Sequence, residues 1–305
     1  MMTQNNRATS GQVIVLAGAT GDLGSRIAQS LLKRSANIRA IVRAGSSNDK
    51  VTALQKQGAT IVEVDYGSAS DLVKACHGAS CVVSALSGLR EVILDVQTKL
   101  LDAAVEAGVP RFIPSDFAID FTKLPYGTNR NLDLRKEFHE RLNKALIAPT
   151  SILNGMFSDL LTGQAPLVQF GLKKVIYWGD ADQLLDFTTM DNTAEYTAAA
   201  ALDPHTPRYL RIAGDVLNAY GLRDAASEAT GKKFGLIRVG GLGVLDTMIK
   251  VTKFIIPGND EVYPPWQGMQ YMRNMLSGLP KLEPLDNDRY SSIQWTPVRE
   301  VLANR

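Results

Sequence analysis

Three glycines with the spacing GxxGxxG, Gly18, Gly21 and Gly24, are the residues whose positions point most directly to chemistry. They follow an apolar run at 13–17 that is typical of a buried parallel strand, and a helical pattern follows at 25–32. Gly18 would allow the tight turn, Gly21 would let the backbone approach a pyrophosphate, and Gly24 would let the helix pack closely on the sheet. The N–H groups at the start of that helix would bind phosphate. The pattern therefore predicts a dinucleotide site rather than an ordinary strand-turn-helix.

The next strand indicates which dinucleotide is bound. It is expected at 38–42 and is followed by Arg43, where an NAD-binding protein usually has an acidic residue for the ribose 2′-hydroxyl. No acidic residue occurs between Asp22 and Asp49. A guanidinium can hold a 2′-phosphate through paired, charge-assisted hydrogen bonds, so the sequence favours NADP(H). The alternative is that Arg43 is only an exposed charge at a strand end. Further polar side chains follow directly: Ser46, Ser47 and Lys50.

Strands and helices alternate along the first half of the chain. Such alternation implies right-handed crossovers and a parallel sheet with helices on both faces, the doubly wound Rossmann class of α/β fold. Ligands of these sheets bind at the carboxyl ends of the strands, so the residues that follow each strand should surround one site. Further strands are expected at 60–64, 81–86, 111–114 and 150–153, and helices at 50–57, 69–76, 92–107 and 132–145.

Residues after the third and sixth strands are expected to contact ligands. Asp65 should lie beside the adenine, because it ends the strand at 60–64. Asn154, Met156 and Phe157 follow the strand at 150–153 and could line the site together with Phe117 and Trp266. The alternative for these five residues is simple packing in the core.

A proton donor is expected on the helix at 132–145. Lys136 projects from a different face than the apolar side chains of that helix, and a partly desolvated lysine near the nicotinamide would suit this role. The alternative is a solvated lysine on an exposed face. Tyr126 has an arginine, Arg130, where a short-chain dehydrogenase has its lysine four residues after the tyrosine, so we reject this pair. His139 is interpreted as a surface or packing residue.

Composition and charge narrow the class of protein. The 305 residues carry 33 Lys and Arg and 31 Asp and Glu, a net charge of +2, so nothing predicts a nucleic-acid-binding surface. Cys76 and Cys81 provide neither a disulfide framework nor metal-ligand spacing, and they should pack as small apolar residues in a reducing compartment. No apolar run reaches the ~20 residues that span a bilayer. No membrane association and no metal site are therefore expected.

The length of the chain allows one large α/β domain and a smaller one. We expect a mobile tail at 1–11, an NADP-binding Rossmann domain at 12–153, and a smaller substrate-covering region at 154–305 that is partly interleaved with the sheet. The polar tail lacks the apolar segment of a secretory signal, so a cytoplasmic protein is expected.

Several segments resemble a known family when they are taken in order. They are the glycine loop at 18–24, Val42 with Arg43, the sequence RFIPSDF at 111–117, and the helix that carries Lys136. The sequence YPPWQGMQY at 263–271 adds to the likeness. The chain resembles the NmrA-like / isoflavone reductase-like family of atypical short-chain dehydrogenase/reductases, most firmly from residue 13 to about 157.

The resemblance implies an NADPH-binding domain, a smaller C-terminal domain and an aromatic-lined site between them. The reductases of the family use a lysine on the helix after the fifth strand. This lysine corresponds to Lys136 in an alignment without a gap and to Arg135 after a one-residue gap. The leading hypothesis is an NADPH-dependent reductase of a small aromatic or conjugated substrate. The alternative is a non-catalytic NADP(H) sensor that binds a protein partner, which an exposed apolar patch on the C-terminal region and a solvent-facing Lys136 would favour.

These arguments together give the expected site. Lys136 is the expected catalytic residue. The expected cofactor contacts are Gly18, Thr20, Gly21, Asp22, Leu23, Gly24, Arg43, Asp65, Tyr66, Ser84, Ala85, Leu86, Ser115, Lys136, Asn154 and Phe157.

Overall fold

The central element is a six-stranded parallel sheet, which confirms the predicted Rossmann class. The computed structural model describes residues 11–46 and 49–305, so all but the last residue of the predicted tail lies outside the described part. The strand order is β3-β2-β1-β4-β5-β6. The sequence order of the strands reverses between β1 and β4, whose carboxyl ends therefore flank the position where such sheets bind ligands. The strands are β1 Val13–Ala17, β2 Asn37–Arg43, β3 Thr60–Val64, β4 Cys81–Ser84, β5 Arg111–Ile113 and β6 Ala148–Pro149.

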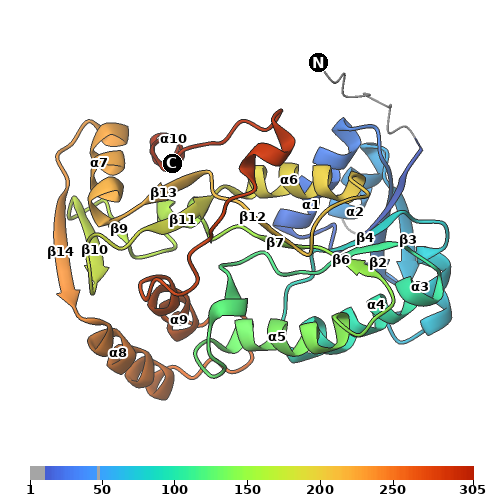
Figure 1. Ribbon diagram of the computed structural model, residues 1–305, viewed down its shortest axis with the longest axis horizontal. Coiled ribbons are helices and arrows are strands. Elements are labelled where there is room, and N and C mark those ends of the chain that lie inside the picture. The colour runs from blue at the N-terminus through green and yellow to red at the C-terminus, as the bar shows by residue number, and fades with distance from the viewer. Residues whose placement is uncertain (1–10, 47–48) are drawn as a thin grey trace.

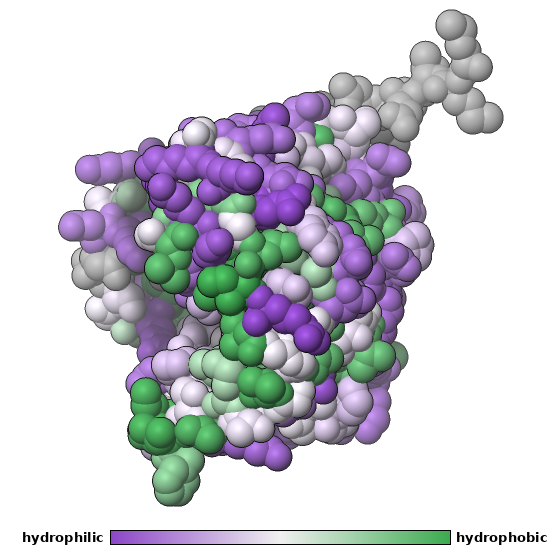
Figure 2. All heavy atoms as spheres, turned by 90° about the vertical axis from the view of Figure 1, so that its left-hand side faces the viewer, coloured by the Kyte–Doolittle hydropathy of each residue, from purple (hydrophilic) through white to green (hydrophobic). Residues whose placement is uncertain are grey.

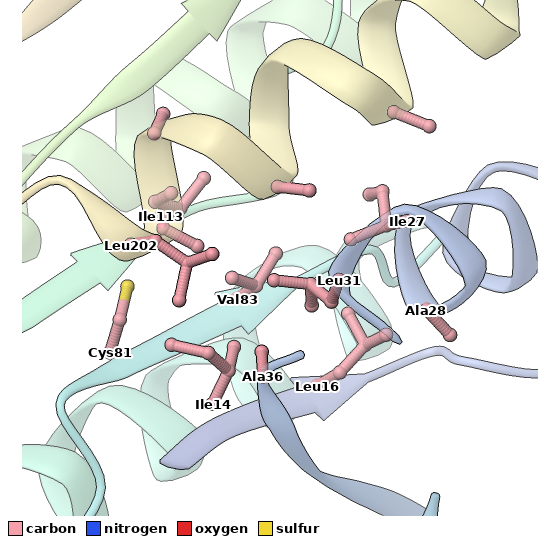
Figure 3. Packing of buried hydrophobic residues seen from close by; sticks show 14 of the residues in the cluster. Ile14, Leu16, Ile27, Ala28, Leu31, Ala36, Cys81, Val83, Ile113 and Leu202 are labelled. Carbon is pink, nitrogen blue, oxygen red and sulfur yellow. The ribbon is translucent and has the colours of Figure 1, made fainter. Parts of the chain in front are cut away.

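Helices cover both faces of this sheet (Figure 1). On one face, α1 and α6 pack against β1 and β4, where Ile14, Leu16 and Val83 are fully buried (Figure 3). On the other face, α3, α4 and α5 pack against Val15 and Val82. Successive residues of a strand point to opposite faces, so the unbroken apolar run of β1 serves both cores. The helices of this layer structure are α1 Asp22–Lys33, α2 Asp49–Lys56, α3 Ala69–Cys76, α4 Gln97–Glu106, α5 Arg130–Leu142 and α6 Met190–Leu202.

The helix predicted at 92–107 is divided into two parts. Glu91–Val96 is a π-helix, and α4 continues from Gln97. The buried Gln97 side chain donates from Nε2 to the carbonyl oxygen of Ile93 at 3.1 Å, while its Oε1 accepts from the backbone N–H of Ser115 at 2.9 Å. A side chain that enters the hydrogen-bond ladder of its own helix accounts for the wider turn. The same side chain ties the helix to the segment after β5.

Smaller sheets form a second domain with a core of its own. One sheet has the order β14-β10-β9, another has the order β13-β11-β8, and β12 pairs with β7. Phe187, Leu245 and Met272 belong to its buried apolar cluster. The strands are β7 Ser151–Leu153, β8 Met156–Phe157, β9 Val168–Gln169, β10 Lys174–Trp178, β11 Leu185–Thr188, β12 Tyr209–Arg211, β13 Asp215–Leu217 and β14 Gly235–Gly240. The helices are α7 Ala219–Thr230, α8 Leu242–Ile255, α9 Pro265–Met275 and α10 Val298–Ala303.

The strand predicted at 150–153 departs from the expected continuation of the sheet. β6 pairs with β5, and the N–H of Thr150 still donates to the carbonyl oxygen of Phe112, whereas β7 pairs with β12, where the N–H of Ser151 donates to the carbonyl oxygen of Arg208. α6 lies after residue 153 in the chain but packs on α1, where Arg26 bonds Asp191 at 2.6 Å. No helix in the described ranges has the length and apolar character that crossing a membrane requires.

Candidate functional site

The glycine loop joins β1 to α1 at the carboxyl edge of the sheet. Gly18 has a φ of +81°, a conformation that favours glycine, and a Cβ there would lie 2.5 Å from the carbonyl oxygen of Ala85. A Cβ on Gly24 would lie 2.0 Å from the carbonyl oxygen of Gly18. The tight turn and the close helix packing expected for these two glycines are therefore both present.

The first turn of α1 has backbone N–H groups without a cap. Gly21 is the N-cap residue and no side chain caps the helix, whereas Asn129 caps α5 and Thr189 caps α6. A Cβ on Gly21 would meet only the carbonyl oxygen of Gly18, at 3.3 Å. The side chain of Asp22 is held by Arg26 at 2.7 Å. The N–H groups of this turn need an acceptor from outside the helix, which a phosphate can supply. Of the other expected contacts in the loop, Thr20 is half-buried and Leu23 packs against the core.

Arg43 ends β2 and is exposed, beside the residues that follow β3. It pairs with Val64, and its positive charge acts on Tyr66, the second residue after β3. Burial raises the pKa of Tyr66 to about 12, although the charge of Arg43 acts in the opposite direction. Asp65 is exposed, and its Oδ1 accepts from the N–H of Gly67 at 2.7 Å. The structure thus brings Arg43, Asp65 and Tyr66 together at one end of the edge. Lys50 is exposed in α2, and Ser47 lies outside the described residues.

A line of contacts runs from the glycine loop across the edge of the sheet. Gly18 lies against Ala85, which follows β4. The next residue, Leu86, accepts a hydrogen bond through its carbonyl oxygen from the hydroxyl of Ser115 at 2.6 Å. The carbonyl oxygen of Ser115 in turn accepts from Nε of Arg135 at 3.0 Å. The residues after β1, β4 and β5 and one face of α5 therefore meet at a single edge.

Arg135 lies at this edge, and Lys136 does not. Arg135 is 7% exposed, so its guanidinium is held inside the protein. The Nζ atom of Lys136 lies 2.7 Å from the carbonyl oxygen of Leu124 and 3.4 Å from Asp133, and 4.5 Å from the centre of the Tyr126 ring. Neighbouring helical residues differ by about 100° in direction, so these two cations cannot share a face. Of the two positions that the sequence left open, Arg135 is the one whose side chain bonds the segment after β5, whereas Lys136 bonds the loop before α5.

Two tyrosines near the start of α9 lie around Arg135, and the sequence analysis did not assign them to the site. Tyr263 and Tyr271 both lie close enough to Arg135 to act on its charge, and Tyr271 also lies near Asn131. Burial raises the pKa of Tyr271 to about 12, so its hydroxyl keeps its proton at pH 7. Both tyrosines belong to the segment 263–271, whose family likeness was the signal that could have found them.

Two buried polar side chains near this edge lack hydrogen-bond partners among the described residues. Ser84, the last residue of β4, is fully buried with an unpartnered hydroxyl. Asn154 follows β7, is fully buried, and has neither amide atom satisfied. Buried polar groups normally find partners, so such exceptions are typical of ligand sites. Phe157 packs against the same apolar cluster to which Phe117 belongs.

A closed hydrogen-bond network of four side chains lies directly behind Ser115. His139 Nε2 and the Ser151 hydroxyl both bond Oδ2 of Asp116, at 2.6 and 2.5 Å. Arg208 donates to Oγ of Ser151 at 2.6 Å and lies 3.2 Å from Nδ1 of His139. A guanidinium only donates, so Nδ1 must accept and Nε2 carries the hydrogen that binds Asp116. Burial alone would raise the pKa of Asp116, but His139, Ser151 and the charge of Arg135 lower it overall. The network holds the segment after β5 in place.

Four further expectations can be compared with the structure. Tyr126 bonds Glu140, whereas the Arg130 guanidinium stacks on Trp266 at 4.7 Å, so the rejected pair is not brought together. Trp266 is buried between Arg130 and Lys253, which agrees with the alternative of simple packing. No group of side chains in the described ranges could hold a metal ion. The two cysteines are free and buried, as predicted.

Comparison with known proteins agrees with the predicted family and fold. The model of the NmrA-like family matches residues 10–263. Pinoresinol reductase 2 of Arabidopsis thaliana is 30% identical over 259 residues, which cover 79% of this chain and 81% of that protein. Pinoresinol reductase 1 of the same plant is 32% identical over 220 residues, which cover 67% of this chain and 69% of that protein.

Solved structures extend the likeness to nearly the whole chain. The structure of AtPrR2 with NADP+ and (+)pinoresinol has a TM-score of 0.81 at 25% identity, and the match covers 96% of this chain and 98% of that one. The binary complex of leucoanthocyanidin reductase with NADPH from Vitis vinifera shares the fold, with a TM-score of 0.79 at 18% identity over 96% of this chain and 98% of that one. With a family model that spans most of its length, the chain belongs to the NmrA-like family, as its resemblance to isoflavone reductase-like proteins predicted.

Proposed function

We propose that this protein is an NADPH-dependent reductase of a small aromatic or conjugated substrate. The observation that carries the proposal is the line of contacts from Gly18 through Ala85, Leu86 and Ser115 to Arg135. It runs along the carboxyl edge of a Rossmann sheet, which is where such sheets bind their ligands. The relatives named for pinoresinol reduction, at 30 and 32% identity, support the same reaction class.

The residues at the edge fit NADP(H). The uncapped start of α1, with Gly21 as its N-cap, suits a pyrophosphate, and the exposed Arg43 suits a 2′-phosphate. Asp65 and Tyr66 would lie beside the adenine, and Asn154 has free amide atoms for a polar group of the ligand. NADPH, when bound, supplies a hydride from C4 of its nicotinamide. The protein contributes orientation and exclusion of water.

We assign the charged role on the substrate side to Arg135 rather than to Lys136. A guanidinium stays protonated near neutral pH, so Arg135 would orient the substrate and stabilise negative charge that develops on it, without giving up a proton. The hydroxyl of Tyr271, protonated at pH 7 with a pKa of about 12, lies beside this cation. It is available to hydrogen-bond a substrate oxygen.

The experiment that tests the proposal is a screen for NADPH oxidation. Purified protein would be supplied with NADPH and, one at a time, with aromatic aldehydes, enones and benzylic ethers, and the absorbance of NADPH would be followed. We expect turnover of at least one class, and loss of that turnover in Gly21→Val. A protein that binds NADPH tightly but reduces none of these compounds would contradict the reductase proposal.

A second candidate function, NADP(H)-dependent binding of a protein partner, is favoured by one observation. The outer side of the second domain carries exposed apolar side chains, and Figure 2 shows such side chains gathered on the face that α7, β14 and α8 form. On α8, Phe254 is 88% exposed and Ile255 is 67% exposed. Lys136, however, is largely covered rather than turned to solvent, which does not fit the pattern expected of a sensor. The reductase proposal therefore stands first.

A further inference from the structure

We infer that Arg135 receives an oxyanion of the substrate, so that the preferred ligands are aromatic compounds that carry a carboxylate or an ionised phenol. The inference rests on the proposed function, because it names the substrate class of the same site. It differs from a lysine-based mechanism, because the cation at the edge of the sheet is a guanidinium.

The partners of Arg135 leave its charge without a counterion in direct contact. Nε donates to the carbonyl oxygen of Ser115 at 3.0 Å, and one terminal nitrogen donates to the carbonyl oxygen of Asn131 at 2.9 Å. Tyr263 lies beside the guanidinium. A guanidinium has five N–H donors, so these two bonds leave donors free. A buried charge is costly unless it is paired, and in the described part of the chain Arg135 forms no salt bridge.

Among the described residues, no acidic side chain bonds Arg135 directly. On Asp116, the carboxylate that acts on Arg135, Oδ2 takes hydrogen bonds from His139 and Ser151, and the buried Oδ1 has no hydrogen-bond partner. Asp133 accepts from Lys136, and Asp120 bonds Arg211 at 3.0 Å. The positive charge at the edge is therefore balanced only in part, and an anionic ligand would complete the balance.

The geometry of the group favours a planar oxyanion attached to a ring. A guanidinium matches a carboxylate with two parallel hydrogen bonds, which the point charge of a lysine does not do. Tyr263 and Tyr271 add aromatic surface beside the cation, and aromatic rings pack favourably against one another. Phosphates of the cofactor have separate partners at the start of α1 and at Arg43, at the glycine-loop end of the edge.

The test compares a matched acid and amide on protein saturated with NADPH. Cinnamate and cinnamamide have the same ring and side chain and differ in charge, and calorimetry would measure the affinity of each. We expect wild-type protein to bind the acid at least about 10-fold more tightly than the amide. Arg135→Gln should weaken the binding of cinnamate by about 10- to 100-fold and leave the binding of cinnamamide nearly unchanged, because only the charge-assisted bonds are lost. Arg135→Lys keeps a buried charge, so its affinity for cinnamate should lie between those of wild-type protein and Arg135→Gln.

Arg141→Ala is the matched control, since Arg141 is an exposed arginine on the same helix. It should bind both compounds as wild-type protein does. A second arm uses 4-nitrophenol, whose visible absorption reports whether it is bound in its ionised form. Preference for cinnamate, for ionised nitrophenol or for both supports the inference and identifies the source of the oxyanion.

Two results would overturn the inference. One is a wild-type protein that binds neither oxyanion more tightly than its neutral counterpart. The other is an Arg135→Gln protein that loses NADPH affinity instead of acid affinity, which would assign the guanidinium to the cofactor. Failure of the proposed function is distinguishable from both, because it would show in the screen as NADPH binding without reduction of any compound, whereas calorimetry measures the affinities for the acid and the amide directly.

Discussion

Gly24→Ala should disrupt the packing of α1 on the sheet and destabilise the protein, and Gly21→Ala should not. A Cβ on Gly24 would lie 2.0 Å from the carbonyl oxygen of Gly18, 2.8 Å from its carbonyl carbon and 3.1 Å from Cα of Ala19. All three atoms belong to the backbone, so relief requires α1 to move from β1 by more than an ångström. Overpacking of this kind costs about 1–3 kcal/mol, and we expect a loss at the upper end, about 3 kcal/mol.

Gly21 provides the matched control on the same loop. Its φ of −73° and ψ of 169° suit any residue, and the added Cβ would meet one oxygen at 3.3 Å. The more restricted unfolded chain of an alanine variant offsets this contact, so the stability of Gly21→Ala should stay within about 1 kcal/mol of wild type. NADPH affinity should nevertheless fall in Gly21→Ala and be nearly abolished in Gly21→Val, because the side chain occupies the space of the pyrophosphate.

Two measurements separate these effects. Urea unfolding followed by tryptophan fluorescence gives the stability of each variant, and titration with NADPH gives its affinity. Gly24→Ala should shift the unfolding midpoint strongly, and Gly21→Val should shift NADPH affinity while the protein stays folded. Wild-type NADPH affinity in a folded Gly21→Val protein would refute the assignment of this loop to phosphate, and an unshifted midpoint in Gly24→Ala would refute the packing argument.

Three further predictions concern charged groups. Arg43→Ala should weaken NADPH binding by about 1.5–3 kcal/mol and spare NADH, and equal wild-type affinity for the two dinucleotides would contradict it. Lys136→Ala should keep turnover within a few-fold of wild type while Arg135→Gln lowers it by about 10²-fold or more, as judged by kcat/KM; the reverse ranking would restore Lys136 as the catalytic residue. The lowered pKa of Asp116 means that its contribution to stability is complete above the ordinary value of 3.8 and is lost as pH falls below it. The free energy of unfolding in urea should therefore fall less with decreasing pH in Asp116→Asn than in wild-type protein. An unchanged dependence on pH would show that the network with His139 contributes little.

Local patterns in the sequence were sufficient to predict most of the first domain. β3 spans Thr60–Val64 and α3 spans Ala69–Cys76, the ranges expected from the apolar runs and their periodicity. These elements were predictable because a parallel strand buried on both faces must be apolar throughout, and a helix above it needs an apolar stripe. The glycine spacing then located the start of α1, because a tight turn and close packing of a helix on a sheet both require residues without a side chain.

Contacts between distant segments were not predictable in this way. Asp116, His139, Ser151 and Arg208 form one closed network, yet they come from the segment after β5, from α5, from β7 and from the residue before β12. Each residue alone has an ordinary interpretation as a packing or surface residue. The pairing of β7 with β12 creates the network, and that pairing depends on the path of the chain between them rather than on any local pattern.

The periodicity of α5 distinguishes Arg135 from Lys136. The buried stripe of α5 contains Leu132, Phe138 and Leu142, and Arg135 and His139 fall on the same stripe. Lys136 lies off it. A polar residue within an apolar helical stripe must be buried, and a buried cation must serve a purpose that offsets its cost. The sequence analysis sought a proton donor among exposed positions beside the stripe. The stripe itself indicates the residue, because the same periodicity that buries Leu132 carries the guanidinium of Arg135 to the edge of the sheet.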